Sequence, residues 1–561
     1  MFPFLRLNSN IRSLRRYWNI VRVLSAYGFD HVLEMLGLSD MVARSKRLLH
    51  RGKADITHLS AAERMRLALE ELGPTFIKLG QLLSTHPDII PQPFVAEFEK
   101  LQDSVPGFSF DELKAQVERE LAAPVETFYS EIDPTPLAAA SIAQVHRARL
   151  VTGEDVVIKV RRPGVVEMVE SDISALMGLA YMAERHVAGS EVYDPVGVVR
   201  EFARTIRREM DFTREGHTIE KFRDNFSTTE WLHFPRVYWQ QTSHGVLTLE
   251  HVEGIKVSDL EALDRAGLDR KLIARRGADA FLEMVLAHGF FHGDPHPGNV
   301  FILPENVICL LDYGIVGRLD EGLKSFVSDI LFAIVNRDVD EVVSQLLFAG
   351  DISENLDVRA LKRDLATFID SYYEIPLHDV RVGQMLLEFV DIVTQYHIRI
   401  QPDLMLLIKA LVIIEGMGRT LDPAFNMIEH LRPFMERAWR QKFSPRRISR
   451  DLSSIMLSYL NLARDLPRDL KEIVNRINRN KLKIDLEHRG LDKFTTDFDR
   501  SVNRLSSSLI LAALIVGSSI IMHTTRGPQF LGFPMLAFFG YTVAGLIGLW
   551  LVYGIIRSGR L

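Results

Sequence analysis

The stretch FFHGDPHPGNVFILPENVICLLDYG, residues 290–314, brings His292, His296, Asp294, Asp312 and Asn299 close together in the chain. Its runs VFIL and VICLL flank the turn PEN, which predicts a small β-hairpin. Such a hairpin would return the residues before and after it to one end of the fold. The histidines could hold a metal ion there, whereas the acids and the amide could hold a phosphate site.

The spacing of the acids and the amide favours the phosphate site. Asn299 follows Asp294 by five residues, and Asp312 follows Asp294 by eighteen. In the protein-kinase plan, an aspartate handles the acceptor hydroxyl, an asparagine five residues on holds a metal, and the aspartate of D-F-G holds Mg²⁺ against the phosphates. Here HGDPHPGN corresponds to H-R-D-x-x-x-x-N and DYG to D-F-G. Mg²⁺ prefers oxygen ligands, which these side chains supply.

The histidines fit a metal site poorly. His292 and His296 are four residues apart, but glycine and proline surround them, so they do not share the face of a helix. We interpret both as residues that make hydrogen bonds within the loop.

The same plan predicts two further elements upstream. A strand lysine should grip the α- and β-phosphates, and VVIKV supplies Lys159. A helical acid should hold that lysine, and REMDFTREGH offers Glu209, Asp211 and Glu215. Each element alone is weak, because a lone strand lysine is usually solvated and an isolated D-Y-G is usually a turn. Four elements in this order and spacing indicate a kinase-like nucleotide site.

Two parts of the plan are missing. PLAAASIAQVH stands where a G-x-G-x-x-G loop should precede Lys159. Alanine carries a Cβ and resists positive φ, so this segment cannot wrap phosphates as glycines do. No A-P-E follows Asp312, and the chain runs directly towards a helix. The sequence therefore predicts altered nucleotide handling and no ordinary platform for a protein substrate.

Composition sets wider limits. The chain has 561 residues, too many for one compact core, and is 25% charged and 47% hydrophobic, which is typical of a folded protein. A net charge of −6 gives no argument for nucleic-acid binding. Cys309 is the one cysteine, which excludes a disulfide framework within the chain and a cysteine-based zinc site. Its apolar surroundings predict a small core residue.

The end of the chain predicts a membrane anchor. Residues 505–525 carry no charge, and a second apolar run spans about 533–556. About 20 apolar residues suffice to cross a bilayer as a helix, so we expect two transmembrane helices in 505–556. The alternative is a buried helical pair in a soluble domain. Arg504 and other basic residues flank the outer ends, while the link carries only Arg526, which places the large domain in the cytoplasm.

Two basic segments remain ambiguous. Residues 1–60 look helical, and their start is rich in arginine before the first acid, Asp30. This could be an organelle transit peptide or a membrane-surface helix, and the amphipathic stretch YWNIVRVLSAYGF favours the surface helix. Residues 441–504 look like a basic helical connector, which either touches anionic lipid or is a solvated helical face.

Together these residues resemble the UbiB/ABC1/ADCK (AarF) family of atypical kinase-like proteins, most closely its bacterial ubiquinone-biosynthesis branch. The resemblance runs from about residue 60 to 320 and then to the membrane tail. FIKLGQ resembles the family's K-x-G-Q motif, AAAS its alanine-rich loop, and EMD its E-x-D motif. The motif residues are Lys78, Gly80 and Gln81, and Glu209 and Asp211.

The resemblance implies a role for each residue of the site. Asp294 would be the catalytic aspartate, and Asn299 and Asp312 would hold Mg²⁺. Lys159 would bind the nucleotide phosphates, with Glu215 as its helical partner.

It also implies a cover over the site. The K-x-G-Q helix, with Lys78 and Gln81, would fold over the place where a protein substrate would otherwise sit, and Glu209 would tie to it. Glu250 would lie at the hinge beside the adenine. The alanine-rich segment would cover the nucleotide with Leu137, Ala138, Ala139, Ala140, Ser141, Ile142, Ala143, Gln144 and Val145.

We therefore expect an α+β protein with a two-lobed protein-kinase-like fold, a helical N-terminal extension and a C-terminal transmembrane helical hairpin. The expected segments are a basic amphipathic N-terminus (1–60), a K-x-G-Q extension (61–125), an N-lobe (126–255), a C-lobe (256–440), a basic connector (441–504) and two membrane helices (505–556).

The resemblance implies an ATPase or phosphotransferase that uses ATP (or ADP) and Mg²⁺ in ubiquinone biosynthesis. Its partners would be isoprenoid quinone precursor lipids, the membrane and other quinone-biosynthesis enzymes, with no nucleic acid. The location would be the inner membrane of a bacterium, with the mitochondrial inner membrane as the alternative. A nucleotide-binding scaffold without catalysis stays open, and a Ser/Thr protein kinase is disfavoured by the missing A-P-E.

Overall fold

The computed structural model divides the chain into two compact units, Met1–Ile448 and Ser449–Leu561, which are taken separately below. The structure describes residues 11–48, 58–84, 90–101, 106–187, 194–349, 356–373, 380–396, 398, 400–433, 491–523, 528–530 and 533–557.

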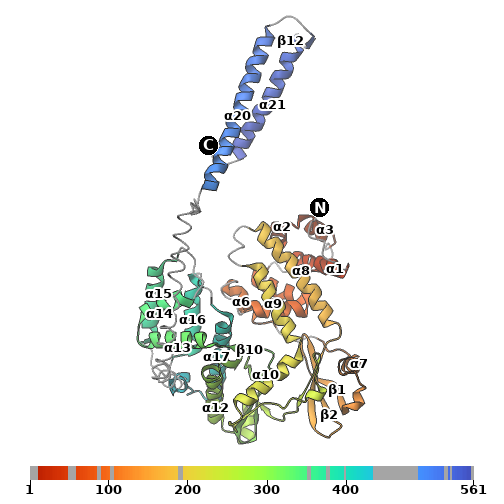
Figure 1. Ribbon diagram of the computed structural model, residues 1–561, viewed down its shortest axis with the longest axis vertical. Helices are drawn as coiled ribbons and strands as arrows, with labels where there is room; N and C mark the ends of the chain where they lie inside the picture. The colour runs from red at the N-terminus through yellow and green to blue at the C-terminus, as the bar shows by residue number, and fades with distance from the viewer. Residues whose placement is uncertain are drawn as a thin grey trace, which may run out of the picture. The chain divides into compact units, whose positions relative to one another are not determined.

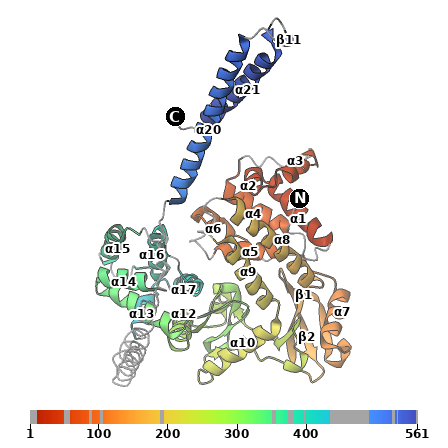
Figure 2. The same ribbon diagram turned by 45° about the horizontal axis from the view of Figure 1, so that its top comes forward.

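Among its described residues, the first unit opens with helices α1 to α6, which pack beside two long helices of the kinase-like region (Figure 2). Their bounds are α1 Ile11–Ala26, α2 Asp30–Met35, α3 Ser39–Leu48, α4 Ala61–Leu72, α5 Pro74–Ser84 and α6 Gln92–Phe98; the two long helices are α8 Val165–His186 and α9 Pro195–Glu209. Gly73 ends α4 with φ 101°, a conformation that glycine adopts readily, and Pro74 begins α5. This tight turn separates α4 from α5, the helix that carries K-x-G-Q.

The N-terminal amphipathic stretch packs on the protein itself. Ile20, Val21 and Val23 of α1 are fully buried. Arg16 forms an ion pair with the buried Asp172 of α8, and its second nitrogen donates to a backbone carbonyl at the end of α4. The expectation of a membrane-surface helix was therefore wrong for this stretch, because its apolar face is already covered by protein.

The N-lobe is a four-stranded antiparallel sheet in the order β1-β2-β3-β5. Figure 1 labels its first two strands, β1 and β2. Its strands are β1 Tyr129–Ala139, β2 Ala143–Leu150, β3 Asp155–Arg161 and β5 Val246–Glu250. The predicted hairpin of β2 and β3 is confirmed, with Gly153 at φ 101° in its turn. Along β3, Val156, Ile158 and Val160 are buried at 0% exposure in one core cluster, so the alternating residues face the other side of the strand.

One helix changes the predicted domain boundary. Helix α7, Phe110–Leu121, begins with a capping box formed by Ser109 and Glu112. Its Leu113 and Val117 belong to the same core cluster as the sheet strands. The helix therefore packs with the N-lobe, and the expected extension of 61–125 ends before it.

The chain leaves the sheet between β3 and β5 to form three helices, α8, α9 and α10, with α10 spanning Phe212–Asn225. These helices share one large core with α4–α6 and with the second lobe. The second lobe begins with short strands in two sheets. They are β4 Leu232–His233, β6 Ile255–Lys256, β8 Val300–Leu303 and β9 Val307–Leu310 in the order β4-β9-β8-β6, and the pair β7 Phe290–His292 and β10 Val316–Arg318. The predicted hairpin of VFIL and VICLL is β8 and β9.

The helices of the second lobe form two clusters. Those that the structure describes here are α11 Leu260–Arg265, α12 Arg270–Leu282, α13 Glu321–Val335, α14 Val339–Ala349, α15 Val358–Tyr373, α16 Val382–Gln395 and α17 Pro402–Leu421. Side chains of α12 and α17 join the main core, whereas α13–α16 contribute to a second core around Leu361 and Leu365. The predicted C-lobe of 256–440 therefore contains a helical subregion with its own core.

The second unit contains helices α20 Leu491–Met522 and α21 Met535–Arg557, joined through the short strands β11 Gln529–Phe530 and β12 Phe533–Pro534. The two helices lie side by side (Figure 1). Ser519 Oγ is 2.6 Å from the Tyr541 hydroxyl. Among the described residues, Leu505–Met522 is long and apolar enough to cross a membrane, and Met535–Leu549 is a shorter apolar helix. The predicted connector of 441–504 lies mostly outside the described residues, and its last part belongs to α20.

Candidate active site

Lys159 lies at the centre of a charged cluster between the lobes. Its ammonium donates to both carboxylate oxygens of Glu215 at 2.9 Å and is 3.6 Å from Asp312 Oδ1. Burial alone would lower the pKa of Lys159, but the carboxylates of Glu215 and Asp312 outweigh it and raise the pKa above its ordinary value. Lys159 therefore stays a cation, as binding to phosphate requires.

A sharp junction between two helices places the acids of the cluster. Glu209 is the last residue of α9, and α10 begins three residues later, so Glu209 and Glu215 flank one turn of the chain. Asp211 is the N-cap of α10, because its carboxylate accepts a hydrogen bond from the Thr213 amide at 3.2 Å. His244 lies 2.8 Å from the same carboxylate. Of the three acids offered by the sequence, Glu215 meets Lys159, and Asp211 has a capping role.

The K-x-G-Q helix reaches the cluster through one ion pair. Lys78 Nζ is 2.6 Å from Glu209 Oε1, with both side chains less than one-fifth exposed. The Lys159 ammonium is the main cause that lowers the pKa of Asp312 below its ordinary value, and the Lys78 ammonium adds to it. The helix therefore lies close enough to influence the charge of the site.

The other two motif residues hold this helix to its neighbours. A Cβ on Gly80 would lie 2.3 Å from a methyl carbon of Leu101, so close packing requires glycine here. Gln81 donates its amide Nε2 to the Leu101 carbonyl at 3.0 Å. Gln81 thus ties α5 to the segment that follows α6.

The alanine-rich segment is mainly strand. Leu137, Ala138 and Ala139 end β1, while Ala143, Gln144 and Val145 begin β2, which leaves three turn residues, Ala140, Ser141 and Ile142. The Ala140 amide donates to the Ala143 carbonyl at 2.8 Å, and Arg162 Nε donates to the Ala140 carbonyl at 3.0 Å. The expected loop is therefore a tight hairpin turn whose backbone is partly used within the protein.

The catalytic loop is tied together by backbone hydrogen bonds. The Leu311 amide donates to the Asn299 carbonyl at 2.8 Å, which brings Asn299 next to the D-Y-G turn. Asn299 Nδ2 donates to the Asp294 carbonyl at 3.3 Å. Gly293 occupies the place of the arginine in H-R-D, and a Cβ there would lie 2.7 Å from a Leu406 methyl of α17. Close approach of α17 thus explains the glycine.

His292 supports this loop as a neutral ring. Its Nε2 donates to the Leu311 carbonyl at 3.1 Å, and its Nδ1 accepts the Asp294 amide at 3.2 Å, which fixes the tautomer. His296 Nδ1 accepts the Gly298 amide at 3.1 Å. Both histidines make the loop hydrogen bonds that the sequence predicted. Burial lowers the pKa of His292 below its ordinary value.

His292 should make the stability of the fold sensitive to acid. Between the lowered folded pKa and the ordinary value near 6.5, the unfolded chain binds a proton at this site and the folded chain does not. The free energy of unfolding should therefore fall with decreasing pH below about 6.5, by up to about 1.4 kcal/mol per pH unit for this group. Urea unfolding of wild type and His292→Gln between pH 7.5 and 5.5 measures it. The variant should show a lower baseline and a shallower pH slope, and equal slopes would contradict the assignment.

Tyr313 of D-Y-G is buried in an aromatic cluster. Its hydroxyl donates to the Leu310 carbonyl at 2.7 Å, which satisfies the one polar atom that distinguishes it from phenylalanine. Its ring lies 5.4 Å from His292 and 5.5 Å from Phe222 of α10, measured between centroids. Phe222 in turn lies 4.6 Å from Phe290 of β7. The cluster connects α10, the catalytic loop and the D-Y-G turn.

Asp312 adopts φ 58°, which is uncommon outside glycine, and accepts the Gly314 amide at 3.3 Å. Its side chain is 58% exposed. Asp312 and Asn299 carry side-chain oxygen atoms of the kind that a hard cation prefers, and the Leu311–Asn299 backbone hydrogen bond keeps the two residues near each other. Among the described residues, no three His, Cys, Asp or Glu side chains gather as a metal site. The residues therefore fit Mg²⁺ that is shared with phosphate oxygens, and they do not fit an all-protein cage.

Glu250 ends β5, and its carboxylate is already used by residues of the segment that includes β4 of the second lobe. One oxygen lies 3.1 Å from His233 Nε2 and accepts the Arg236 amide at 3.0 Å. The hydrogen bond to His233 is the main cause that lowers the pKa of Glu250. A place beside the adenine would therefore fall to the backbone that follows β5.

The comparisons with known proteins agree with this geometry. Residues 100–346 match the ABC1 atypical kinase-like domain, 365–426 the UbiB helical domain and 489–557 the ABC1/UbiB kinase-like C-terminal domain. A Pseudomonas putida protein named probable protein kinase UbiB is 36% identical over 469 residues, 82% of this chain and 86% of its own. The chain belongs to the ABC1/UbiB family of atypical kinase-like proteins. The family assignment made from the K-x-G-Q, E-x-D and D-Y-G motifs is thus confirmed.

Other relatives extend over nearly the whole chain. A probable protein kinase UbiB from Xanthomonas oryzae is 33% identical over 523 residues, 91% of this chain and 93% of its own. An uncharacterized protein from the hydrogenase 1 5′ region of Clostridium pasteurianum is 30% identical over 552 residues, which are 98% of this chain and 100% of its own. Among solved structures, a Mycobacterium tuberculosis protein in complex with erythromycin covers 65% of this chain and 96% of its own, at 21% identity and a TM-score of 0.42.

Two residues of this ABC1/UbiB site, Arg161 and Phe222, were missed by sequence reasoning. Arg161 lies two residues after Lys159 on the same face of β3, a signal that strand periodicity could have given. Phe222 had no such signal, because its partners are rings that lie far from it in the sequence.

Proposed function

We propose that this protein uses Mg²⁺ and ATP at a membrane to support ubiquinone or related isoprenoid quinone biosynthesis, as an ATPase or phosphotransferase. ATP turnover would be coupled to the access or presentation of lipid quinone precursors. The observation that carries the proposal is the position of Lys159, held by Glu215 at 2.9 Å and 3.6 Å from Asp312. This is the arrangement in which a kinase-like site grips phosphates beside its metal-binding aspartate.

Each residue would have a distinct task. Lys159 would neutralise the α- and β-phosphates, and Asp294 would orient the attacking hydroxyl or water. Asp312 and Asn299 would hold Mg²⁺, which supplies charge neutralisation at the transferred phosphoryl group. Low exposure of Glu215 strengthens its grip on Lys159 and keeps the ammonium in place.

A lipid-soluble substrate is supported by three features. The relatives from Pseudomonas and Xanthomonas carry the name UbiB. The helical stretch Leu505–Met522 can cross a bilayer. The Lys78–Glu209 pair holds the K-x-G-Q helix beside the site, where it would hinder a protein substrate. We place the protein at the inner membrane of a bacterium, with its large unit in the cytoplasm.

A nucleotide-binding scaffold is the second candidate. It is favoured by the hairpin turn at Ala140, whose amide is already bonded to the Ala143 carbonyl and is not offered to a phosphate.

The test uses full-length protein in liposomes with Mg²⁺ and ATP labelled on the γ-phosphate, and Asp312→Asn as the inactive control. Free labelled phosphate that depends on Asp312 and rises with a lipid quinone precursor supports the ATPase. Label on a lipid or small molecule makes the protein a kinase of that compound. Label on added proteins would refute the proposal in favour of protein phosphorylation, and nucleotide binding without turnover would favour the scaffold.

A further inference from the structure

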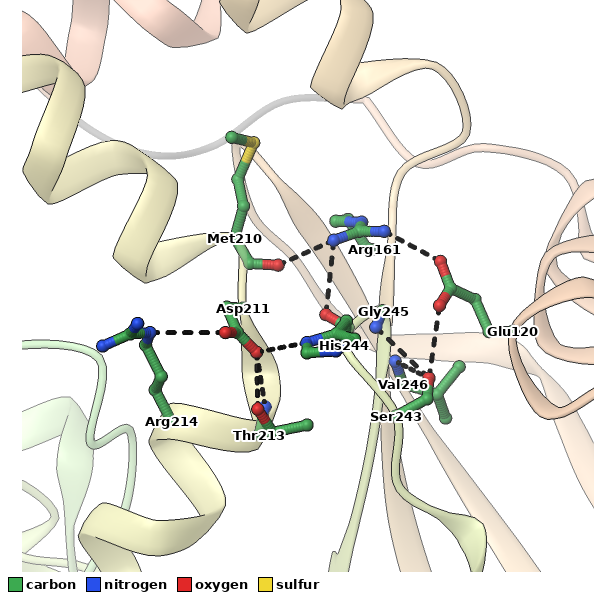
Figure 3. A network of polar contacts seen from close by, with 10 residues as sticks. All are labelled: Glu120, Arg161, Met210, Asp211, Thr213, Arg214, Ser243, His244, Gly245 and Val246. Carbon is green, nitrogen blue, oxygen red and sulfur yellow. Dashed lines mark hydrogen bonds and ion pairs between the residues drawn. The ribbon is translucent and has the colours of Figure 1, made fainter.

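Arg161 links four elements of the N-lobe at the end of β3 (Figure 3). Its Nη1 donates to the Met210 carbonyl at 2.9 Å and to the His244 carbonyl at 3.3 Å. Its Nη2 donates to Glu120 Oε1 of α7 at 2.8 Å. One guanidinium thus connects α7, the α9–α10 junction and the segment before β5.

The Glu120 carboxylate is fixed from two further directions. Gln116 Nε2 donates to its Oε1 at 3.1 Å, and Ser243 Oγ donates to its Oε2 at 3.3 Å (Figure 3 draws the second of these). The side chains of Arg161 and Glu120 are each 16% exposed, so solvent screens this pair less than a surface pair. A Cβ on Gly245 would lie 2.2 Å from Oε1, so the carboxylate occupies space that glycine leaves open.

Strand periodicity puts Arg161 and Lys159 on the same face of β3. Lys159 holds the side chain of Glu215 in the first turn of α10, and Arg161 holds the carbonyl of Met210 just before that helix. The strand therefore grips the start of α10 at two points. The same junction ends α9 at Glu209, which pairs with Lys78 of the cover.

We propose that Arg161 is a positioning residue, and that Glu120 and Arg161 together set the α9–α10 junction so that Glu215 meets Lys159 and Glu209 meets Lys78. Loosening the junction shifts both acids at once, because only five residues separate them in the chain. The catalytic pair and the cover are therefore coupled through one polar network. This inference rests on the proposed function only where turnover is the readout.

The first test measures the junction directly. Hydrogen exchange of peptides covering residues 210–216 is compared in wild type, Arg161→Met and Arg161→Lys, with melting temperatures as a folding check. Arg149→Met is the matched control, because it removes an arginine–aspartate pair on neighbouring β2 at an exposed site. We expect faster exchange in Arg161→Met, partial recovery in Arg161→Lys and no change in the control. Unchanged exchange in folded Arg161→Met would overturn the proposal.

Gly245→Ala offers an independent probe. The variant keeps every charge, and its methyl group displaces the Glu120 carboxylate from Arg161. The direction of change in exchange should match that of Arg161→Met, with a smaller size. An unaltered junction in this variant, together with an unaltered junction in Glu120→Gln, would remove Glu120 from the proposal.

The second test asks whether Arg161 acts through Glu215. Arg161→Met should lower kcat by roughly 10- to 100-fold, because small misplacements of catalytic groups carry costs of that order, with a smaller change in KM for ATP. On a Glu215→Gln background, Arg161→Met should have little further effect. Additive losses would overturn the coupling. If wild type shows no turnover, the proposed function fails, while altered exchange would still support the role of Arg161.

Discussion

Lys159→Met is expected to reduce ATP turnover to background and also to lower the free energy of unfolding by about 3–5 kcal/mol. The second effect arises because Glu215 is only 7% exposed, so removal of the ammonium leaves a poorly solvated carboxylate without its counter-charge. Burial already raises the pKa of Glu215, and Lys159 opposes that shift. Loss of Lys159 should therefore drive Glu215 towards its protonated form.

The two effects separate in a second variant. Lys159→Met combined with Glu215→Leu removes the isolated charge, so the melting temperature should recover while turnover stays at background. Thermal unfolding and γ-phosphate release are both measured on detergent-solubilised protein. A Lys159→Met variant as stable as wild type would show that the buried pair is unimportant for folding. Turnover restored by the second change would remove Lys159 from catalysis.

The polar residues of the site and their order along the chain were predictable, because phosphate and metal binding fix both the residue types and their spacing. A strand lysine, a catalytic-loop aspartate, an asparagine five residues later and a D-Y-G aspartate leave few alternative folds. The hairpin of β8 and β9 then returns Asn299 beside the D-Y-G turn, as its two β-branched runs indicated. Choosing Glu215 as the partner of Lys159 needed the family resemblance, since Glu209 and Asp211 have the same charge.

The N-terminal helix could not be assigned in the same way. An apolar stripe on a helix reports that the stripe is buried, and it does not report whether lipid or protein covers it. Asp172 of α8 shows that protein covers this helix, because a fully buried carboxylate requires a cation, and Arg16 supplies one. The packing partner of α7 could not be predicted for the same reason, since Leu113 and Val117 could have packed on either the helical extension or the N-lobe sheet.

Positioning by backbone atoms is also invisible in sequence. Arg161 donates to the carbonyls of Met210 and His244, and His292 donates to that of Leu311. A carbonyl is present at every residue, so no pattern of side chains marks these acceptors. Such contacts appear only when the fold brings the segments together.

Phe222→Ala is expected to cost about 3–5 kcal/mol of stability and also to lower turnover in the fraction that stays folded. Phe222 is fully buried and lies 4.6 Å from Phe290 and 5.5 Å from Tyr313 between ring centroids. It therefore packs α10 against both the catalytic strand β7 and the D-Y-G turn. A cavity at this place would let Tyr313 shift, and Asp312 would move with it.

Phe226→Ala is the matched control for this prediction. Phe226 is 3% exposed and lies 5.8 Å from Phe234 and 5.1 Å from His288, and neither of these two ring contacts involves Tyr313 or Phe290. Both variants should lose similar stability, because each removes a buried phenylalanine from the same core. Turnover per folded molecule, measured well below either melting temperature, should fall only in Phe222→Ala and recover in Phe222→Leu. Equal turnover in the two alanine variants would mean that the aromatic cluster stabilises the lobes without aligning Asp312.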